Sequence, residues 1–188
     1  MSPSAIELNV GTSLKEDIAS GDLTAQLLPA VQTSQARIIT REAGVLCGTA
    51  WFDTCFKALD KNCVINWLAH DGDAIKPGQT LCEISGSSRA LLTAERSALN
   101  LLQTLSATAT KTRVYVDAVA GLPVKIMDTR KTLPGLREAQ KYAVRVGGGF
   151  NQRVGLFDGI LIKENHIAAA GGIAAVLEQA FLLAKQSV

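Results

Sequence analysis

Hydrophobic residues recur along this chain with helical spacing in some segments and form short apolar runs in others. Between Arg89 and Ala107, leucine and alanine return every three or four residues, which predicts an amphipathic helix. Short apolar runs separated by glycine and proline predict strands and turns. The predicted helices are 14–19, 51–60, 89–107, 110–119 and 173–184, and the predicted strands lie within 36–46, 62–69 and 71–88.

The segment from Val124 to His166 predicts a strand, a helix and a second strand. The apolar run 124–127 ends at Asp128, and Pro134 and Gly135 then open a helix that three glycines end after Val146. A fully apolar run, Gly159–Ile162, is typical of a strand buried on both faces. Parallel strands in such folds present their functional residues at their carboxyl ends.

Cationic side chains follow both predicted strands. Arg130 and Lys131 come after the first, Lys163 comes after the second, and Arg153 lies in the glycine-rich approach to the second. Because guanidinium and ammonium groups pair with carboxylates and phosphates, the sequence predicts an anionic ligand with more than one charged group.

Other polar residues have simpler interpretations. Arg137, Lys141 and Arg145 share one side of the predicted helix, away from its apolar face, and we expect them to be solvated. We expect Asp128 to orient Arg130 or the strand end and His166 to be a hydrogen-bonded structural histidine.

Arg96 is unusual because it lies on an otherwise apolar helix. A charged residue there is either paired, with Glu95, Glu83 or a carbonyl as candidates, or functional. The residues themselves leave both readings open.

Composition narrows the class of protein. The chain has 188 residues, of which 47% are hydrophobic, and a net charge of +2, enough for a sizeable core. No polybasic run predicts nucleic-acid binding, and no apolar stretch or leader predicts a membrane location, so a cytoplasmic protein is expected. The cysteines lack metal-site spacing, which favours buried free thiols: Cys47, Cys55, Cys63 and Cys82.

Several strings in the chain resemble one known family. They include ITREAGVLCG, HDGDAIKPGQTL, LLTAERSALNLLQTLSATAT, DTRKTLPGLREAQKYAV, GGGFNQR and DGILIKENHI. In order and spacing they resemble the N-terminal two-thirds of bacterial quinolinate phosphoribosyltransferase, also called nicotinate-nucleotide pyrophosphorylase (carboxylating). The resemblance implies an α+β, sandwich-like N-terminal domain over residues 1–112 and, over residues 113–188, the first part of an α/β barrel that is incomplete in this chain.

The resemblance also implies a reaction. Quinolinate and phosphoribosyl pyrophosphate, with Mg²⁺, would give nicotinate mononucleotide, pyrophosphate and CO₂. The family's metal ligands would lie beyond this chain, and the enzyme would be a homodimer in which the N-terminal domain packs on the partner's barrel.

The site residues that the resemblance implies are carried over by position. The quinolinate carboxylates would be held by Arg130, Arg153 and Lys163. Lys131 would face phosphoribosyl pyrophosphate, and Lys131 and Lys163 are the expected catalytic cations. Arg96 would reach the neighbouring subunit's site. The full expected substrate-binding set is Arg96, Thr129, Arg130, Lys131, Gln152, Arg153 and Lys163.

One residue departs from the family pattern, because Gln152 stands where the family has histidine. Two alternatives remain at this point. One is the related protein associated with molybdenum transport, against which the retained cations argue, and the other is a dimerising fragment that binds anions without turnover.

Overall fold

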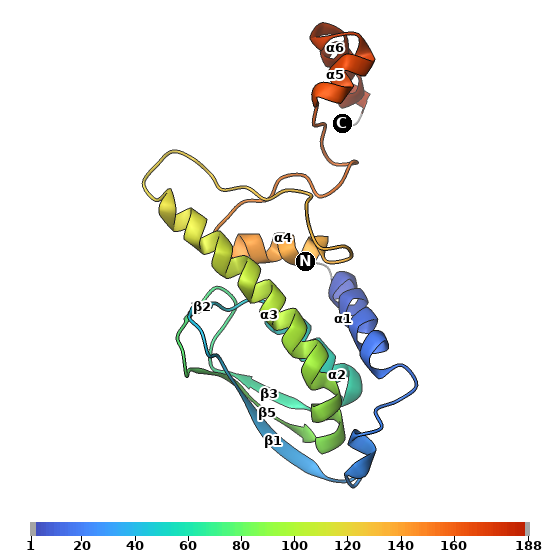
Figure 1. The fold of residues 1–188 in the computed structure, drawn as a ribbon, viewed down its shortest axis with the longest axis vertical. Helices are drawn as coiled ribbons and strands as arrows, with labels where there is room; N and C mark the ends of the chain where they lie inside the picture. Colours follow the sequence, from blue (N-terminus) through green and yellow to red (C-terminus); the bar gives the residue numbers. More distant parts are fainter. Residues whose placement is uncertain (1–2, 187–188) are drawn as a thin grey trace. The chain divides into compact units, whose positions relative to one another are not determined.

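The computed structural model describes residues 3–186, and the chain divides into two compact units. The first unit ends at Gln152 and the second begins at Arg153. Figure 1 labels most of their helices and strands. The elements of the first unit are α1 (Pro3–Ile18), the 3₁₀ turn η1 (Ala25–Leu27), β1 (Thr33–Ile39), β2 (Gly44–Val45), α2 (Thr49–Leu59), β3 (Val64–Trp67), β4 (Ala74–Ile75), β5 (Thr80–Ser87), α3 (Ser88–Ala118) and α4 (Arg137–Val146). The second unit contains α5 (Glu164–Ala170) and α6 (Ile173–Gln186).

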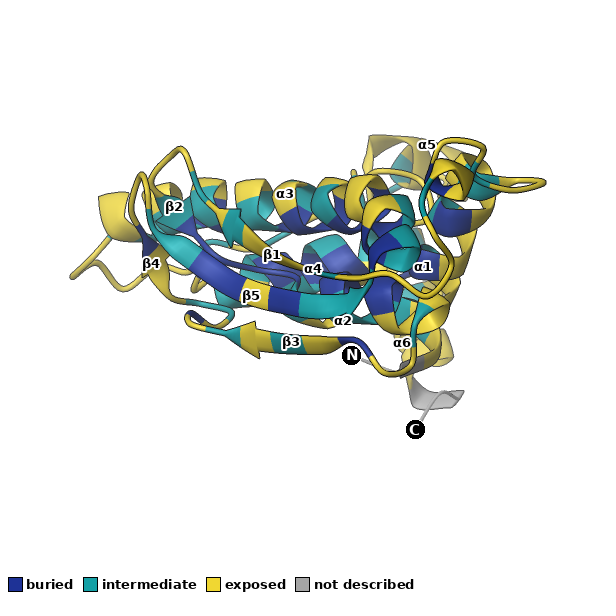
Figure 2. Ribbon diagram, turned by 90° about the horizontal axis from the view of Figure 1, so that it is seen from below, coloured by how far each residue is buried: buried dark blue, intermediate teal, exposed yellow. Residues whose placement is uncertain are grey.

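An antiparallel sheet with strand order β1-β5-β3 forms one layer of the first unit. Ile84 in the central strand lies opposite Ile65 on one side, and the neighbouring row places Glu83 opposite Arg37. Since successive side chains of a strand point to opposite faces, Ile84 is buried and Glu83 is exposed. In Figure 2 the one exposed position of β5 lies between two buried ones. The short strands β2 and β4 pair separately.

The hydrophobic core lies between this sheet and the helices of the first unit. Trp51 and Phe52 on α2 are 1% and 0% exposed, and Leu105 on α3 is fully buried. The ring of Phe52 contacts those of Phe56 and Trp67 at centroid distances of 4.8 and 5.2 Å. The predicted helix at 51–60 and strand at 62–69 are confirmed by α2 and β3.

Helix α3 is one continuous helix of 31 residues, so the helical segments predicted at 89–107 and 110–119 are confirmed, but the predicted break between them is wrong. The prediction failed at a threonine-rich stretch, since β-branched residues have reduced helix propensity. In the structure the hydroxyls of Thr108 and Thr112 donate to carbonyls one turn earlier. Thr110 Oγ1 accepts from the Val45 N–H at 2.8 Å, so tertiary contacts use these side chains inside the helix.

Helix α1 is also longer than the short helix predicted at 14–19, and it ends one residue earlier, at Ile18. Val10 and Leu14 pack into the core, and Asn9 accepts a hydrogen bond from Trp51 Nε1 at 3.1 Å. These long-range contacts stabilise the first helical turns of α1, which local sequence preference did not predict.

Helix α4 confirms the predicted helix between Gly135 and the glycine triplet. Ala139 and Ala143 are fully buried, and α4 packs on α3 so closely that a Cβ on Gly147 would lie 2.5 Å from the Ala109 carbonyl. Only glycine fits where α4 ends this close to α3.

A carboxylate links α4 to the start of α2. Asp71 accepts hydrogen bonds from the backbone N–H groups of Gly48 and Thr49 and from Tyr142 Oη at 2.8 Å. Burial, followed by the hydrogen bond to Asp71, raises the pKa of Tyr142 above its usual value. Asp71 thus caps α2 from a different segment and ties α4 to it.

The two strands predicted around the cationic residues do not form as strands in the described residues. The run 124–127 makes only an isolated parallel bridge between Met127 and Phe150, and Gly159–Ile162 has no assigned secondary structure. Ile160 is 56% exposed, so its expected burial on both faces is also wrong. A strand requires a neighbour that completes its ladder of hydrogen bonds, and the described part of the second unit offers none.

The second unit contains the predicted helix at 173–184 as α6. No single described helix is long and apolar enough to cross a membrane, although α5 and α6 taken together, bent by 97°, meet the length and composition test.

The four cysteines are free and buried, as predicted. Burial raises the pKa of Cys55 and of Cys82 to about 12. Their thiols are therefore protonated and unreactive at neutral pH.

Candidate functional site

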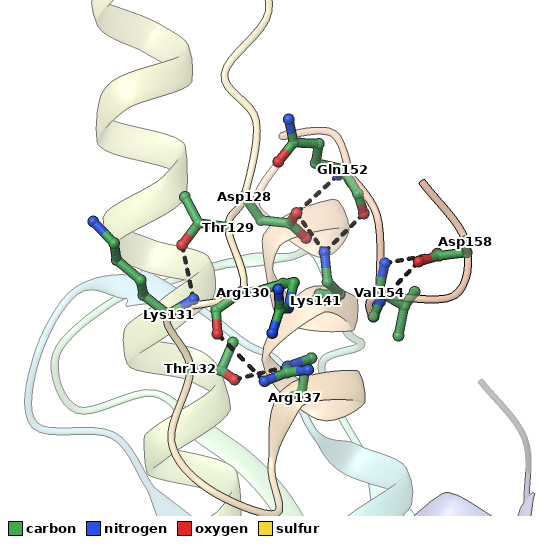
Figure 3. Close-up of polar contacts among 11 residues, drawn as sticks. Asp128, Thr129, Arg130, Lys131, Thr132, Arg137, Lys141, Gln152, Val154 and Asp158 are labelled. Carbon is green, nitrogen blue, oxygen red and sulfur yellow. Dashed lines mark hydrogen bonds and ion pairs between the residues drawn. The ribbon is translucent and has the colours of Figure 1, made fainter. Parts of the chain in front are cut away.

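A turn containing Thr129, Arg130 and Lys131 follows the bridged residue Met127. Thr129 Oγ1 accepts the backbone N–H of Lys131 at 3.0 Å, which closes the turn. The Lys131 side chain extends away from α4, whereas the Arg130 side chain lies beside it (Figure 3). This turn therefore presents two cationic side chains in different directions.

Arg130 carries a buried donor without an acceptor. Its Nε atom is inaccessible to solvent and is the only such unsatisfied side-chain atom among the described residues. A buried unpaired N–H is costly, and a guanidinium presents its donors as a fork that suits a carboxylate. The guanidinium of Arg130 therefore has one donor that no side chain or carbonyl of the described residues satisfies.

Lys141 and Asp128 form a buried ion pair behind this turn. Lys141 is 2% exposed, and its Nζ lies 2.6 Å from Asp128 Oδ1. The predicted solvation of Lys141 is therefore wrong, and Asp128 pairs with Lys141 and not with Arg130. Arg145 is exposed as predicted, while Arg137 is half-buried and donates to Thr132 Oγ1 at 3.4 Å.

Gln152 joins the same cluster through its backbone. Its N–H donates to Asp128 Oδ1 at 2.8 Å, and its carbonyl accepts from Lys141 Nζ at 2.8 Å. Its side-chain amide points away from Asp128 (Figure 3). With its amide oriented to satisfy its neighbours, Asn151 donates to Asp128 Oδ2 at 3.0 Å and to the Lys141 carbonyl at 2.9 Å. Gln152 thus keeps its side chain exposed and available.

The remaining cations of the candidate set lie in the second unit. Arg153 donates to the Gly159 carbonyl at 2.9 Å, and Asp158 accepts the N–H groups of Val154 and Gly155, so the loop 153–159 is internally braced (Figure 3). Lys163 is exposed at the start of α5.

His166 accepts the Lys163 backbone N–H at Nδ1, at 2.9 Å. The predicted hydrogen-bonded histidine is confirmed, and its ring must carry any single proton on Nε2.

Arg96 lies exposed on α3. In the part of the chain that the structure describes, it makes no hydrogen bond or ion pair, so the paired alternative is not observed. Its guanidinium is free for a ligand or a partner.

The structure thus brings Thr129, Arg130, Lys131 and Gln152 together in the first unit around one buried ion pair. Sequence reasoning missed the role of Lys141. The sequence signal that could have indicated its burial was its position between Ala139 and Ala143, on a short helix that follows Asp128. In the first unit the candidate site therefore combines two cationic side chains, one of them with an unsatisfied guanidinium donor, on an α+β scaffold.

Two family models match the chain almost end to end. The N-terminal domain of quinolinate phosphoribosyl transferase matches residues 22–106, and the C-terminal domain of the same family matches residues 108–188.

Relatives of the chain carry the same kind of name. A probable nicotinate-nucleotide pyrophosphorylase [carboxylating] from Bacillus subtilis (strain 168) is 48% identical over 158 residues, covering 84% of this chain and 55% of the relative. The nicotinate-nucleotide pyrophosphorylase [carboxylating] of Mycobacterium leprae (strain TN) is 45% identical over 168 residues, covering 86% and 58%. The chain spans about half the length of the curated relatives it matches.

Similar solved structures support the same family. The nicotinate-nucleotide pyrophosphorylase from Francisella tularensis superposes with a TM-score of 0.93 at 48% identity, covering 97% of this chain and 65% of that one. NadC from Streptococcus pyogenes gives 0.93 at 40% identity, covering 98% and 66%. The chain belongs to the quinolinate phosphoribosyl transferase family. Its predicted fold class, an α+β N-terminal domain followed by part of an α/β barrel, is confirmed.

Proposed function

We propose that this chain carries the quinolinate-binding part of a phosphoribosyltransferase. The reaction would join quinolinate to the ribose of phosphoribosyl pyrophosphate and release pyrophosphate and CO₂, giving nicotinate mononucleotide for NAD biosynthesis. The family membership supports the reaction, and the unsatisfied buried Nε of Arg130 is the observation that carries the site.

The proposed roles follow the charges of the side chains. Arg130, Arg153 and Lys163 hold the carboxylates of quinolinate, and Thr129 lines the site. The amide of Gln152 donates a hydrogen bond in place of the family's histidine but carries no charge. Lys131, which extends away from α4, faces the phosphoribosyl pyrophosphate.

The chemistry needs positioning and charge stabilisation, with no nucleophilic side chain. Held beside the ribose, the ring nitrogen of quinolinate forms the bond to the ribose carbon as the bond to pyrophosphate breaks. Lys131 and Lys163 stabilise the negative charge on the departing oxygens. The positive nitrogen of the alkylated ring stabilises the carbanion left on the adjacent ring carbon when its carboxylate leaves as CO₂, and that carbon then takes a proton from water.

The magnesium expected from the family resemblance does not fit these residues by themselves. Among the described residues, no three His, Cys, Asp or Glu side chains gather into a metal-binding group. No step above is therefore routed through a metal ion.

The assembly and its location extend the proposal. Arg96, exposed and without a partner in the described structure, would complete the site of a second subunit in a homodimer. A cytoplasmic location and a domain boundary at 112/113 remain predictions. The family models end and begin close to that boundary, at residues 106 and 108.

Isothermal titration with quinolinate tests the site. Arg130→Ala should weaken binding by about 2 to 5 kcal/mol, more than roughly twentyfold in affinity. Arg41→Ala, at an exposed arginine with no partner in the described structure, is the matched control and should bind as the parent does. Unchanged affinity in Arg130→Ala would refute the assignment.

Turnover separates the enzyme from its alternatives. The relatives' names favour the quinolinate reaction over a molybdenum-transport role. Nicotinate mononucleotide formed by the chain from quinolinate and phosphoribosyl pyrophosphate, with magnesium added, would establish catalysis. Quinolinate binding without product would instead support the non-catalytic anion-binding fragment.

A further inference from the structure

Lys141 is the one charged residue among the buried residues that the structure describes. Its side chain is 3% exposed and that of Asp128 is 5% exposed. Removing two charges from water has a desolvation cost that their attraction often only balances, so stability alone is a weak reason for such a pair.

The positions of the contacts suggest another role. Asp128 directly precedes the turn that contains Thr129, Arg130 and Lys131, while Lys141 Nζ contacts both Asp128 Oδ1 and the Gln152 carbonyl. Asp128 Oδ1 also accepts the Gln152 N–H. One buried pair therefore holds the bases of two ligand-facing segments that lie far apart in sequence.

Backbone contacts between these segments are few. The Phe150 N–H donates to the Ile126 carbonyl and the Asp128 N–H to the Phe150 carbonyl, at 2.9 and 3.0 Å, and the bridge extends no further as a strand. Without a full ladder to fix the register, side-chain contacts must set it.

We propose that Lys141 is a positioning residue: paired with Asp128, it fixes the turn Thr129–Lys131 against Gln152 and so sets the geometry in which these residues meet the substrate. The part that concerns the substrate rests on the proposed function. The ordering of the two segments does not.

The decisive variant is the neutral pair Asp128→Asn with Lys141→Met. It leaves no buried charge unpaired, and the asparagine oxygen can still accept the Gln152 N–H. The Asn151 amide and the Gln152 carbonyl lose one partner each, so the melting temperature should fall by less than roughly 10 °C. Lys57→Met, at an exposed lysine on α2, is the matched control.

The readout that needs no ligand is amide hydrogen exchange. In the neutral pair we expect the Gln152 and Lys131 amides to exchange roughly tenfold or more faster, while amides of α3 keep their protection. Parent-like exchange at these two amides would overturn the proposal. This result is independent of whether the chain binds quinolinate.

Quinolinate titration supplies the second readout. In a chain that binds quinolinate, the neutral pair should bind it roughly tenfold to a hundredfold more weakly, because small misplacements of ligand-holding groups have effects of that size. Full affinity in the stable neutral pair would show that the pair does not position the site. Absence of binding in the parent would count against the proposed function and leave the exchange result to decide the positioning role.

Should the neutral pair fail to fold, Lys141→Arg provides the test. It keeps the charge opposite Asp128, but a guanidinium cannot reproduce the single Nζ that contacts both Asp128 and the Gln152 carbonyl. Faster exchange at Gln152 with the melting temperature retained supports the proposal, and parent-like exchange overturns it.

Discussion

The two units of the chain contain similar apolar side chains but bury them very differently. In the first unit Trp51 and Phe52 are 1% and 0% exposed. In the second unit Phe157 and Phe181 are 86% and 66% exposed, and none of its described hydrophobic side chains is buried. The first unit packs helices on a sheet, whereas the second has helices and no sheet among the described residues.

This difference shows that an apolar pattern specifies a core only where another layer meets it. The first unit offers β5, α2 and α3 as facing layers, so its pattern becomes a core. The apolar run Gly159–Ile162 has the composition of a buried strand but lacks a neighbour in the described structure. Without a facing layer, a run of the same composition stays exposed.

Truncating one phenylalanine in each unit is the strongest test. Phe52→Ala should lower the free energy of unfolding by about 3 to 5 kcal/mol, because it opens a cavity in the closed core. Phe181→Ala, its matched control, should change it by less than about 0.5 kcal/mol. Urea unfolding followed by far-UV circular dichroism, which reports the helices of both units, measures both. Equal losses would show that the second unit has a core of its own.

Hydrogen exchange should separate the units without mutation. Amides in the middle of α3 should exchange roughly a thousandfold more slowly than those of α6, since opening α3 requires unfolding the core and opening α6 does not. Mass spectrometry of peptides from each helix provides the measurement. Comparable protection in α6 would contradict the contrast between the units.

Within the first unit, the hydrogen bonds of Asp71 that link α4 to α2 should contribute measurably to the free energy of unfolding. Tyr142→Phe removes a hydrogen bond to the Asp71 carboxylate and should destabilise the chain by about 1 to 2 kcal/mol. Tyr115→Phe, at a tyrosine that is 53% exposed, should have almost no effect. Thermal unfolding of the two variants compares them directly. Equal melting temperatures would mean that Asp71 caps α2 without help from α4.

The smallest predicted effect depends on pH. The Ser87 N–H, and then that of Asn62, lower the pKa of Asp60 below its usual value. A lowered folded pKa gives a contribution to stability that is present above the unfolded pKa, near 3.8, and is lost as the pH falls through the folded value. Asp60→Asn should therefore be less stable than the parent at pH 7, with the gap closing in acid. Thermal unfolding of the parent and of Asp60→Asn at neutral and acid pH measures this gap, and a gap that persists in acid would contradict the prediction.

Much of the candidate site was visible in the sequence, because Arg130, Lys131 and Lys163 follow apolar runs and, like Arg153 in the glycine-rich approach to the second run, match a family pattern. The partners of those residues were not visible. Lys141 and Arg145 are both basic residues on one helix, yet one is buried in an ion pair and the other is exposed. Spacing along a helix gives the face of a side chain, whereas its burial depends on what packs against that face.

The sequence by itself determined the family, the fold class, the buried cysteines and most helices, since these depend on local spacing and on long matching strings. Tertiary structure alone decided the unbroken length of α3, the extension of α1, the unsatisfied Nε of Arg130 and the pairing of Lys141 with Asp128. Each of these depends on a contact between residues distant in sequence, such as Val45 with Thr110 or Asn9 with Trp51. The free energy of such a contact exists only once the chain has folded, so no local pattern encodes it.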